Sequence, residues 1–293
     1  MQFLGGAGTG KAQPLYSKVL TPNGYITMGD VKVGTEVITA KGNIGKVSGI
    51  YPQGKRDIYE ITLQDRTKIR VADNHLNSVW VYNQRTKQRE DYVLETLDLI
   101  EFIKSSKWKV RIDTPSVDFE QQEVLINPYL LGALLGDGGL SNTYQKGTTL
   151  RGNLRFTNSE QDILDKVNTI LKDEYGMTLQ HIANYDYKIK YIENPKHNGS
   201  KGDKGRYPVV YNYNKEETLR GQLEQYGLLC RVTDKHIPQE YLLNTKEVRL
   251  QVLQGLFDTD GTIGNEGSTI TFSTSSKTLS DDFAFLVRSL GIR

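Results

Sequence analysis

The sequence has only one cysteine, and it lacks the long apolar segments and leader sequences that mark several classes of protein. A lone Cys230 cannot form a disulfide framework or a cysteine-rich zinc site. No apolar run approaches the roughly 20 residues that a membrane span needs. The N-terminal residues Met1–Gly6 lack the basic and apolar regions of a signal peptide. We therefore expect a protein of the reducing cytoplasm with no membrane partner.

Net charge of either sign is also scarce. The chain has 37 Lys and Arg against 35 Asp and Glu, a formal net charge of +2, so any contact with nucleic acid must come from local clusters. The hydrophobic content of 37% is ordinary for a globular protein and argues against disorder. A length of 293 residues exceeds most single cores and predicts two domains.

A phosphate-binding pattern at the start of the chain is interrupted. Residues Gly5–Lys11 fit G-x-x-x-x-G-K, which in a working P-loop is followed by Ser or Thr and a helix. Here Ala12 follows, and Val19–Gly24 reads as strand and turn. We therefore interpret Lys11 as the end of a host fragment into which another sequence is inserted. A P-loop ATPase with a β-rich accessory domain is the alternative.

The rest of the chain divides into a part rich in expected strands and a part rich in expected helices. Strands are expected at 18–27, 34–39, 46–51, 57–63, 68–71 and 79–82, with a hairpin turn at Asn23-Gly24 and a short helix over Glu95–Ile103. Helical periodicity begins beyond a linker at Ile112–Val117, with helices expected at 129–135, 161–171, 219–226, 246–257 and 280–290.

The second half contains an internal repeat. Leu130–Gly138 reads LLGALLGDG and matches Leu253–Gly261, which reads LQGLFDTDG. The strand patterns that follow, Leu154–Ser159 and Ile270–Ser275, also match. Because the second copy stops at Arg293, soon after its first helix, we expect it to be incomplete.

Both repeated helices have start and stop signals. Asn127-Pro128 is a favourable N-cap and first turn, and Asn244 followed by Glu247 resembles a capping box. Gly138 and Gly261 suit the left-handed position that ends a helix.

The glycines and aspartates inside these helices indicate a shared site. Gly132 and Gly255 each cost about 1 kcal/mol relative to alanine within a helix, which indicates a close approach of the two helices. Asp137 and Asp260 then lie at adjacent C-termini, where the helix dipole disfavours an anion. Two such carboxylates repel each other unless a hard cation such as Mg²⁺ lies between them.

These residues resemble the LAGLIDADG homing endonucleases. The resemblance implies two pseudo-symmetric αββαββα halves, the second incomplete here, whose sheets lie on double-stranded DNA. It implies that Asp137 and Asp260 bind Mg²⁺ or another divalent cation, with backbone carbonyls of Gly136 and Thr259 as further ligands. Asp258 has no acidic counterpart in the first copy and is not assigned as a ligand.

A basic residue precedes the second motif helix. Asp234–Pro238 reads DKHIP and resembles the family's K-x-I-P block. Lys235 is therefore the candidate for stabilising the cleaved phosphate. The alternative is an exposed loop lysine.

A segment rich in tyrosine and lysine suggests where DNA binds. Tyr185–Tyr213 contains six tyrosines, and six basic residues against three acidic ones. Mixed aromatic and basic side chains on β-structure suit contacts with phosphates and base edges. The alternative is a solvated hairpin. The candidate DNA-binding residues are Lys188, Lys190, Lys201, Lys204 and Arg206.

The first half resembles the Hint fold of inteins, an all-β, horseshoe-like splicing domain. Residues 12–37 resemble the N-terminal splicing block, and Ile61–His75 resembles the next block. The resemblance implies that His75 protonates the amide of the Lys11–Ala12 bond and that Asn74 positions it. Ala12 stands where the nucleophile is expected, either as an engineered block or as a natural variant.

The expected organisation is a host remnant at 1–11, the Hint part at 12–117 and the endonuclease at 118–293. The implied partners are the host ATPase flanks, DNA of the uninterrupted host gene and a complementary C-terminal intein fragment. A split intein, a truncation or an incomplete gene would each explain the absence of a C-terminal splicing block. A non-cleaving relative of the maturase or regulator kind is the alternative function.

Overall fold

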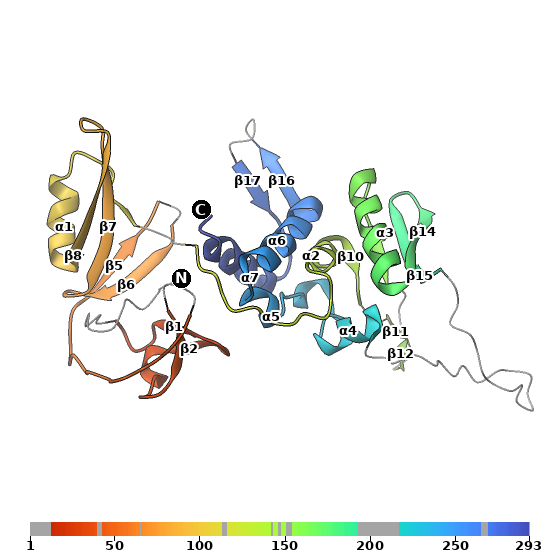
Figure 1. Ribbon diagram of the computed structural model, residues 1–293, viewed down its shortest axis with the longest axis horizontal. Helices are drawn as coiled ribbons and strands as arrows, with labels where there is room; N and C mark the ends of the chain where they lie inside the picture. Colours follow the sequence, from red (N-terminus) through yellow and green to blue (C-terminus); the bar gives the residue numbers. More distant parts are fainter. Residues whose placement is uncertain are drawn as a thin grey trace, which may run out of the picture. The chain divides into compact units, whose positions relative to one another are not determined.

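A computed structural model describes residues 13–39, 43–64, 66–112, 116–141, 143–145, 148–150, 154–192, 217–264 and 269–292. By its internal contacts the chain divides into two units, Met1–Glu120 with Arg288–Arg293, and Gln121–Val287 (Figure 1). The predictions for the P-loop fragment, Ala12, Lys201, Lys204 and Arg206 lie outside the described residues.

The first unit consists mainly of short antiparallel sheets, as the sequence predicts. Three hairpins pair β1 with β2, β3 with β4 and β5 with β6, and a further sheet has the strand order β8-β7-β9. The elements are β1 (Lys18–Thr21), β2 (Gly24–Thr27), η1 (Met28–Asp30), β3 (Glu36–Ile38), β4 (Ile44–Lys46), β5 (Ile58–Thr62), β6 (Lys68–Ala72), β7 (Leu76–Asn83), β8 (Gln88–Glu95), α1 (Thr96–Ser105) and β9 (Arg111–Ile112).

Two expectations for this unit need correction. Strand β8 was not expected, because its sequence QREDYVLE is largely polar; it forms by pairing with the whole of β7, from Leu76 opposite Glu95 to Asn83 opposite Gln88. The strand expected at 46–51 is present only at Lys46, because β4 pairs with a three-residue partner. The helix expected over Glu95–Ile103 is confirmed as α1.

The second unit alternates helices with antiparallel strands. Its four-stranded sheet has the order β10-β13-β15-β14. The elements are α2 (Pro128–Asp137), β10 (Gly138–Gly139), β11 (Thr143–Gln145), β12 (Thr148–Leu150), β13 (Arg155–Thr157), α3 (Gln161–Tyr175), β14 (Met177–Ala183), β15 (Asp186–Tyr191), α4 (Leu219–Gln225), η3 (Val232–Asp234), α5 (Gln239–Leu242), α6 (Lys246–Asp260), β16 (Gly261–Gly264), β17 (Thr269–Phe272) and α7 (Lys277–Ser289).

The internal repeat is visible in the element order. Helix α2 leads into β10, which pairs with β13 before α3; helix α6 leads into β16, which pairs with β17 before α7. The paired helices α2 and α6 lie side by side at the centre of this unit (Figure 1). Both helices carry fully buried leucines, including Leu130 and Leu134 of α2 and Leu256 of α6. No helix in the described part of the chain is long and apolar enough to cross a membrane.

Candidate functional site

The two repeated helices touch backbone to backbone at their glycines. A Cβ atom on Gly132 would overlap the backbone oxygen of Val252 and lie 3.0 Å from the Cα atom of Gly255. A Cβ atom on Gly255 would overlap the backbone oxygen of Tyr129. Any larger residue would therefore separate the helices, and the expected close approach is confirmed.

The N-terminal ends of the helices match the sequence at one helix and differ at the other. Asn127 caps α2 by accepting hydrogen bonds from backbone N–H groups of the first turn, as expected. At α6 the cap is Thr245, whose hydroxyl accepts from the Val248 N–H at 3.4 Å, so the capping box predicted at Asn244 is wrong. The Asn244 side chain is instead buried and hydrogen-bonded to both backbone groups of Gln122. It thereby joins the segments that precede the two helices.

The C-terminal ends also differ from expectation. The backbone is extended at Gly138 and Gly261, with φ angles of −77° and −84°. The predicted left-handed conformation is therefore wrong. Each glycine starts a strand directly after its helix. A Cβ atom on Gly138 would overlap the oxygen of Leu134, and one on Gly261 the oxygen of Phe257. Glycine is needed there for space rather than for backbone angle.

Asp137 and Asp260 are the last residues of α2 and α6, and both are half-buried. A Cβ atom on Gly136 would lie 3.4 Å from Oδ2 of Asp260, so the second carboxylate adjoins the end of the first helix. Burial raises the pKa of Asp137, and the negative charge of Asp260 raises it further. Burial likewise raises the pKa of Asp260. Both effects penalise two bare carboxylates and favour a cation between them.

Lys235 is buried, with 3% of its surface exposed, so the alternative of an exposed loop lysine is wrong. Burial lowers the pKa of its ammonium group, while the nearby charge of Asp260 opposes that shift. The ammonium group donates to backbone carbonyl groups at the end of α2 and at the start of β10. The accepting oxygens belong to Leu134 (3.4 Å), Leu135 (2.8 Å), Gly136 (3.1 Å) and Gly138 (2.9 Å).

The donor groups present fit a magnesium-like cation. The described residues contain no cluster of three or more His, Cys, Asp or Glu side chains, so a cation at the helix ends would have the carboxylates of Asp137 and Asp260 as its charged donors. Mg²⁺ is commonly held by one or two carboxylates and keeps several waters. The predicted carbonyl ligand of Gly136 already accepts from Lys235. Thr259 turns its hydroxyl toward the oxygens of its own helix, at 2.9 and 3.2 Å, so only its carbonyl could serve as the predicted ligand.

Two neighbouring polar residues have roles in the packing that can be read from their contacts. Asp258, which the sequence left out of the ligand set, accepts a hydrogen bond from the Tyr129 hydroxyl at 2.9 Å. Asn158, which sequence reasoning missed, donates its amide to Oδ2 of Asp137 at 2.6 Å. The available signal was its position in the repeat, where Asn158 corresponds to Thr274.

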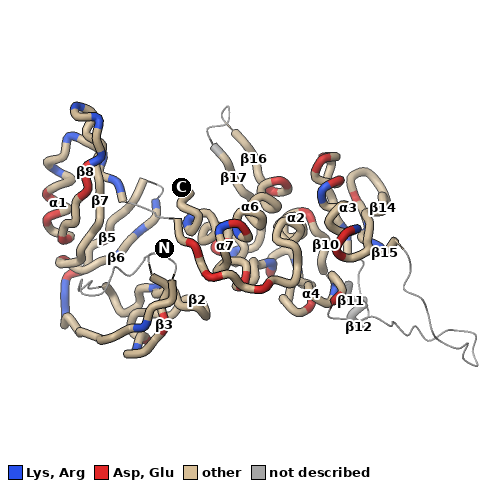
Figure 2. The backbone as a smooth tube through the Cα atoms, viewed as in Figure 1, with Lys and Arg blue, Asp and Glu red and all other residues tan. Residues whose placement is uncertain are grey.

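The candidate DNA-binding residues that can be described lie on the four-stranded sheet. Lys188 and Lys190 alternate along β15 with the buried Ile189, so they share the outward face. Arg155 of β13 lies directly opposite Lys188 and is also exposed, a basic residue that the sequence analysis missed. It forms an ion pair with Asp186 at 2.7 Å. Figure 2 shows basic and acidic positions intermixed around β15 and α3.

In the first unit, His75 lies between β6 and β7 and is 8% exposed. Its carbonyl accepts from the Asn77 side chain at 2.9 Å, and the Thr96 hydroxyl donates to the carbonyl of Ala72 at 2.7 Å. The side-chain oxygen of Asn74 is buried without a hydrogen-bond partner among the described residues. The loop that holds both predicted splicing residues is thus tied down, but the bond at residues 11–12 lies outside the described residues.

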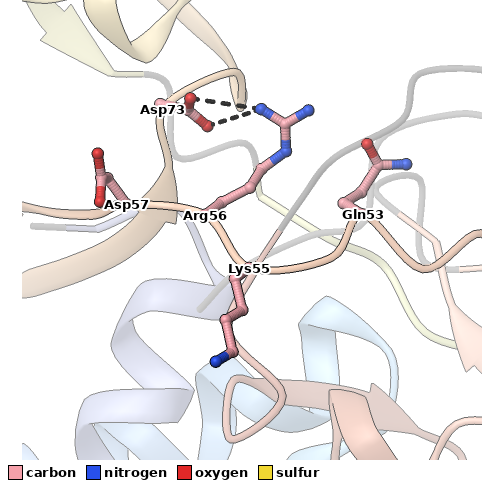
Figure 3. Close-up of a pocket in the computed structure, with 5 residues that line it drawn as sticks. All are labelled: Gln53, Lys55, Arg56, Asp57 and Asp73. Atoms are coloured by element: carbon pink, nitrogen blue, oxygen red, sulfur yellow. Dashed lines mark hydrogen bonds and ion pairs between the residues drawn. The ribbon is translucent and has the colours of Figure 1, made fainter.

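A surface pocket borders the same loop (Figure 3). Arg56 points at Asp73 and donates to both carboxylate oxygens, at 3.0 and 3.3 Å, whereas Lys55 and Asp57 point away. Asp73 in turn accepts the backbone N–H of Asn74. The ion pair therefore links Arg56 to the loop that leads to His75.

Comparisons with known proteins give a match to one family and to one relative. Residues 247–293, which include most of α6 and Asp260, match the LAGLIDADG-like domain. The chain is also 26% identical over 309 residues to a protein of Mycobacterium intracellulare named "Replicative DNA helicase DnaB". That alignment covers 98% of this chain and 43% of the relative, so the chain spans less than half the relative's length. The chain thus carries a LAGLIDADG-like domain at its C-terminal end and has distant similarity to the helicase along nearly all its length.

Proposed function

We propose that this chain is an intein segment that carries a LAGLIDADG homing endonuclease, a site-specific enzyme that cuts both strands of DNA. The observation that carries the proposal is the pair of packed helices α2 and α6. Each ends in a half-buried aspartate, and the carboxylate of Asp260 adjoins the end of α2. The match of residues 247–293 to the LAGLIDADG-like domain supports it, since it contains the second of these helices.

In this proposal Asp137 and Asp260 hold a divalent cation. When bound, such a cation activates water and neutralises developing charge on a phosphodiester. Lys235 holds the end of α2, and with it the carbonyl of Gly136, through its bonds to four carbonyl oxygens. The outward basic residues Arg155, Lys188 and Lys190 contact backbone phosphates. Lys201, Lys204 and Arg206 remain predicted DNA contacts.

The test is cleavage of a plasmid that carries an uninterrupted replicative helicase gene, the host suggested by the helicase relative. We expect linear product in Mg²⁺ and none with either Asp137→Asn or Asp260→Asn. Tight binding without nicking, unchanged by removal of Mg²⁺, would instead favour the non-cleaving module.

The first unit is proposed to be a Hint-type splicing part, with the helicase flanks and a C-terminal intein segment as partners. Support comes from the buried His75, and from helicase similarity that extends over 98% of the chain rather than over the P-loop fragment alone. As Ala12 carries no nucleophile, the test introduces one. With Ala12→Cys we expect the new thiol to attack the carbonyl of residue 11, which breaks the amide bond, frees the amine of residue 12 and forms a thioester. Dithiothreitol should then cleave the chain at this position by thiol exchange with that thioester. Loss of that cleavage on adding His75→Ala supports the role of His75, and unchanged cleavage contradicts it.

A further inference from the structure

The two halves of the repeat present different side chains to their aspartates. Strands β13 and β17 pair with the first glycine after each repeated helix through Phe156 and Phe272, and two residues further on lie Asn158 and Thr274. Each of these side chains accepts, through its oxygen, the backbone N–H two residues ahead, at 2.7 and 3.2 Å. Asn158 and Thr274 are therefore structurally equivalent.

Only one of them also reaches the adjacent aspartate. The amide of Asn158 donates to Oδ2 of Asp137 at 2.6 Å. Thr274 has no amide, and in the part of the chain that the structure describes no side chain donates a hydrogen bond to the carboxylate of Asp260. The asymmetry arises from a single difference in residue type at equivalent positions.

The orientation of the Asn158 amide is determined by its surroundings. The side-chain oxygen of Asn158 accepts the backbone N–H of Glu160. The backbone N–H of Asn158 donates to the carbonyl of Tyr185 at 3.0 Å, which fixes the backbone at this position. Asn158 is 9% exposed, so its NH₂ group needs an acceptor within the protein, which is Asp137. Lys235 adds to the asymmetry, because the carbonyls it binds belong to the end of α2 and to Gly138 directly after it.

We propose that Asn158 is a positioning residue that holds the Asp137 carboxylate for a divalent cation and makes Asp137 a stronger cation ligand than Asp260. The proposal rests on the proposed cation-binding function of the two aspartates. One oxygen of Asp137 is held by the amide and the other remains for the ion, so less conformational freedom is lost on binding. Loss of such outer partners typically weakens metal affinity by roughly 10- to 100-fold.

The experiment exchanges the two residue types, with Mn²⁺ alone as the probe and no DNA. Asn158→Thr keeps an oxygen acceptor for the Glu160 N–H but removes the donor to Asp137. We expect calorimetric titration to show the Mn²⁺ affinity weakened about tenfold or more. Thr274→Asn should strengthen Mn²⁺ binding, and Thr274→Ala, the matched control, should change the affinity by no more than about twofold.

The two aspartates supply a second measurement. Asp137→Asn should weaken Mn²⁺ binding more than Asp260→Asn does, because Asp137 is the stronger ligand in this proposal. Equal effects of these two variants, or an Asn158→Thr titration that matches that of Thr274→Ala, would overturn the role of Asn158 while leaving cation binding intact. A chain that binds no Mn²⁺, or whose titration neither Asp137→Asn nor Asp260→Asn alters, would overturn the cation-binding function itself, and the role of Asn158 with it.

Discussion

The Nζ atom of Lys235 lies 2.8 Å from the backbone oxygen of Leu135, a residue one hundred positions earlier in the chain. This contact places a buried cation against the carbonyl end of a helix, where positive charge and hydrogen-bond donors are both favourable. The two carboxylates of the candidate site are close enough that their charges oppose the loss of its proton.

Replacing Lys235 with methionine, which has a similar length but no donor, should destabilise the second unit. Several carbonyls of α2 would lose their buried partner, at a cost of about 1–3 kcal/mol. Urea denaturation of Lys235→Met measures this change, with Lys172→Met on the exposed part of α3 as the control. Equal midpoints for the two variants would argue against this capping role.

Gly132→Ala should also destabilise the protein, by about 1–3 kcal/mol, because the new methyl group would overlap the backbone of α6. The gain in helix propensity, about 1 kcal/mol, offsets only part of this cost. Gly264→Ala is the control, since a Cβ atom there meets no neighbour within 4 Å. Thermal melting compares the two, and equal melting temperatures would contradict the close helix contact.

The carboxylates predict how stability depends on pH. The pKa values of Asp137 and Asp260 in the folded chain are raised above the ordinary value of 3.8, mainly by burial. The folded state therefore binds protons more readily than the unfolded state, and these two groups make the protein less stable as pH rises from 3.8 through their folded-state pKa values. Asp137→Asn with Asp260→Asn should raise the unfolding midpoint at pH 7 without a divalent cation. A lower midpoint for the double variant would contradict the repulsion.

The outward face of the sheet predicts a salt effect on DNA binding. Arg155→Ala, Lys188→Ala and Lys190→Ala should each weaken binding and reduce the slope of log affinity against log salt by about 1. Lys172→Ala, on α3 rather than on the sheet, is the control. Fluorescence anisotropy with a labelled duplex measures the slope. Slopes that match the unmodified chain would place the DNA elsewhere.

Thr96→Val tests the loop around His75. Thr96 is 1% exposed, and valine keeps its shape but leaves the Ala72 carbonyl without that donor, at a cost of about 1–3 kcal/mol. Hydrogen exchange near residues 72–77 should accelerate, whereas Thr62→Val, on an exposed position of β5, should leave it unchanged. Unaltered exchange in Thr96→Val would show that the loop is held by other contacts.

Local sequence patterns were sufficient for several features of this protein. The Asn127 cap, the positions of the repeated helices and a hairpin near Asn23-Gly24 depend on neighbouring residues or on a short period, although the turn itself is Pro22-Asn23 because Gly24 pairs with Thr21. The helix contact at Gly132 was also predictable, because a glycine inside an apolar helix is costly and therefore informative.

Tertiary structure decided what depends on residues far apart in the chain. The burial of Lys235, the amide of Asn158 beside Asp137 and the extended conformation of Gly138 each result from contacts across the fold. A side chain's own type does not reveal which distant carbonyl or carboxylate will lie within hydrogen-bond reach. The sequence by itself therefore determined that two aspartate-ended helices pair, and the tertiary structure decided that their two ends are unequal.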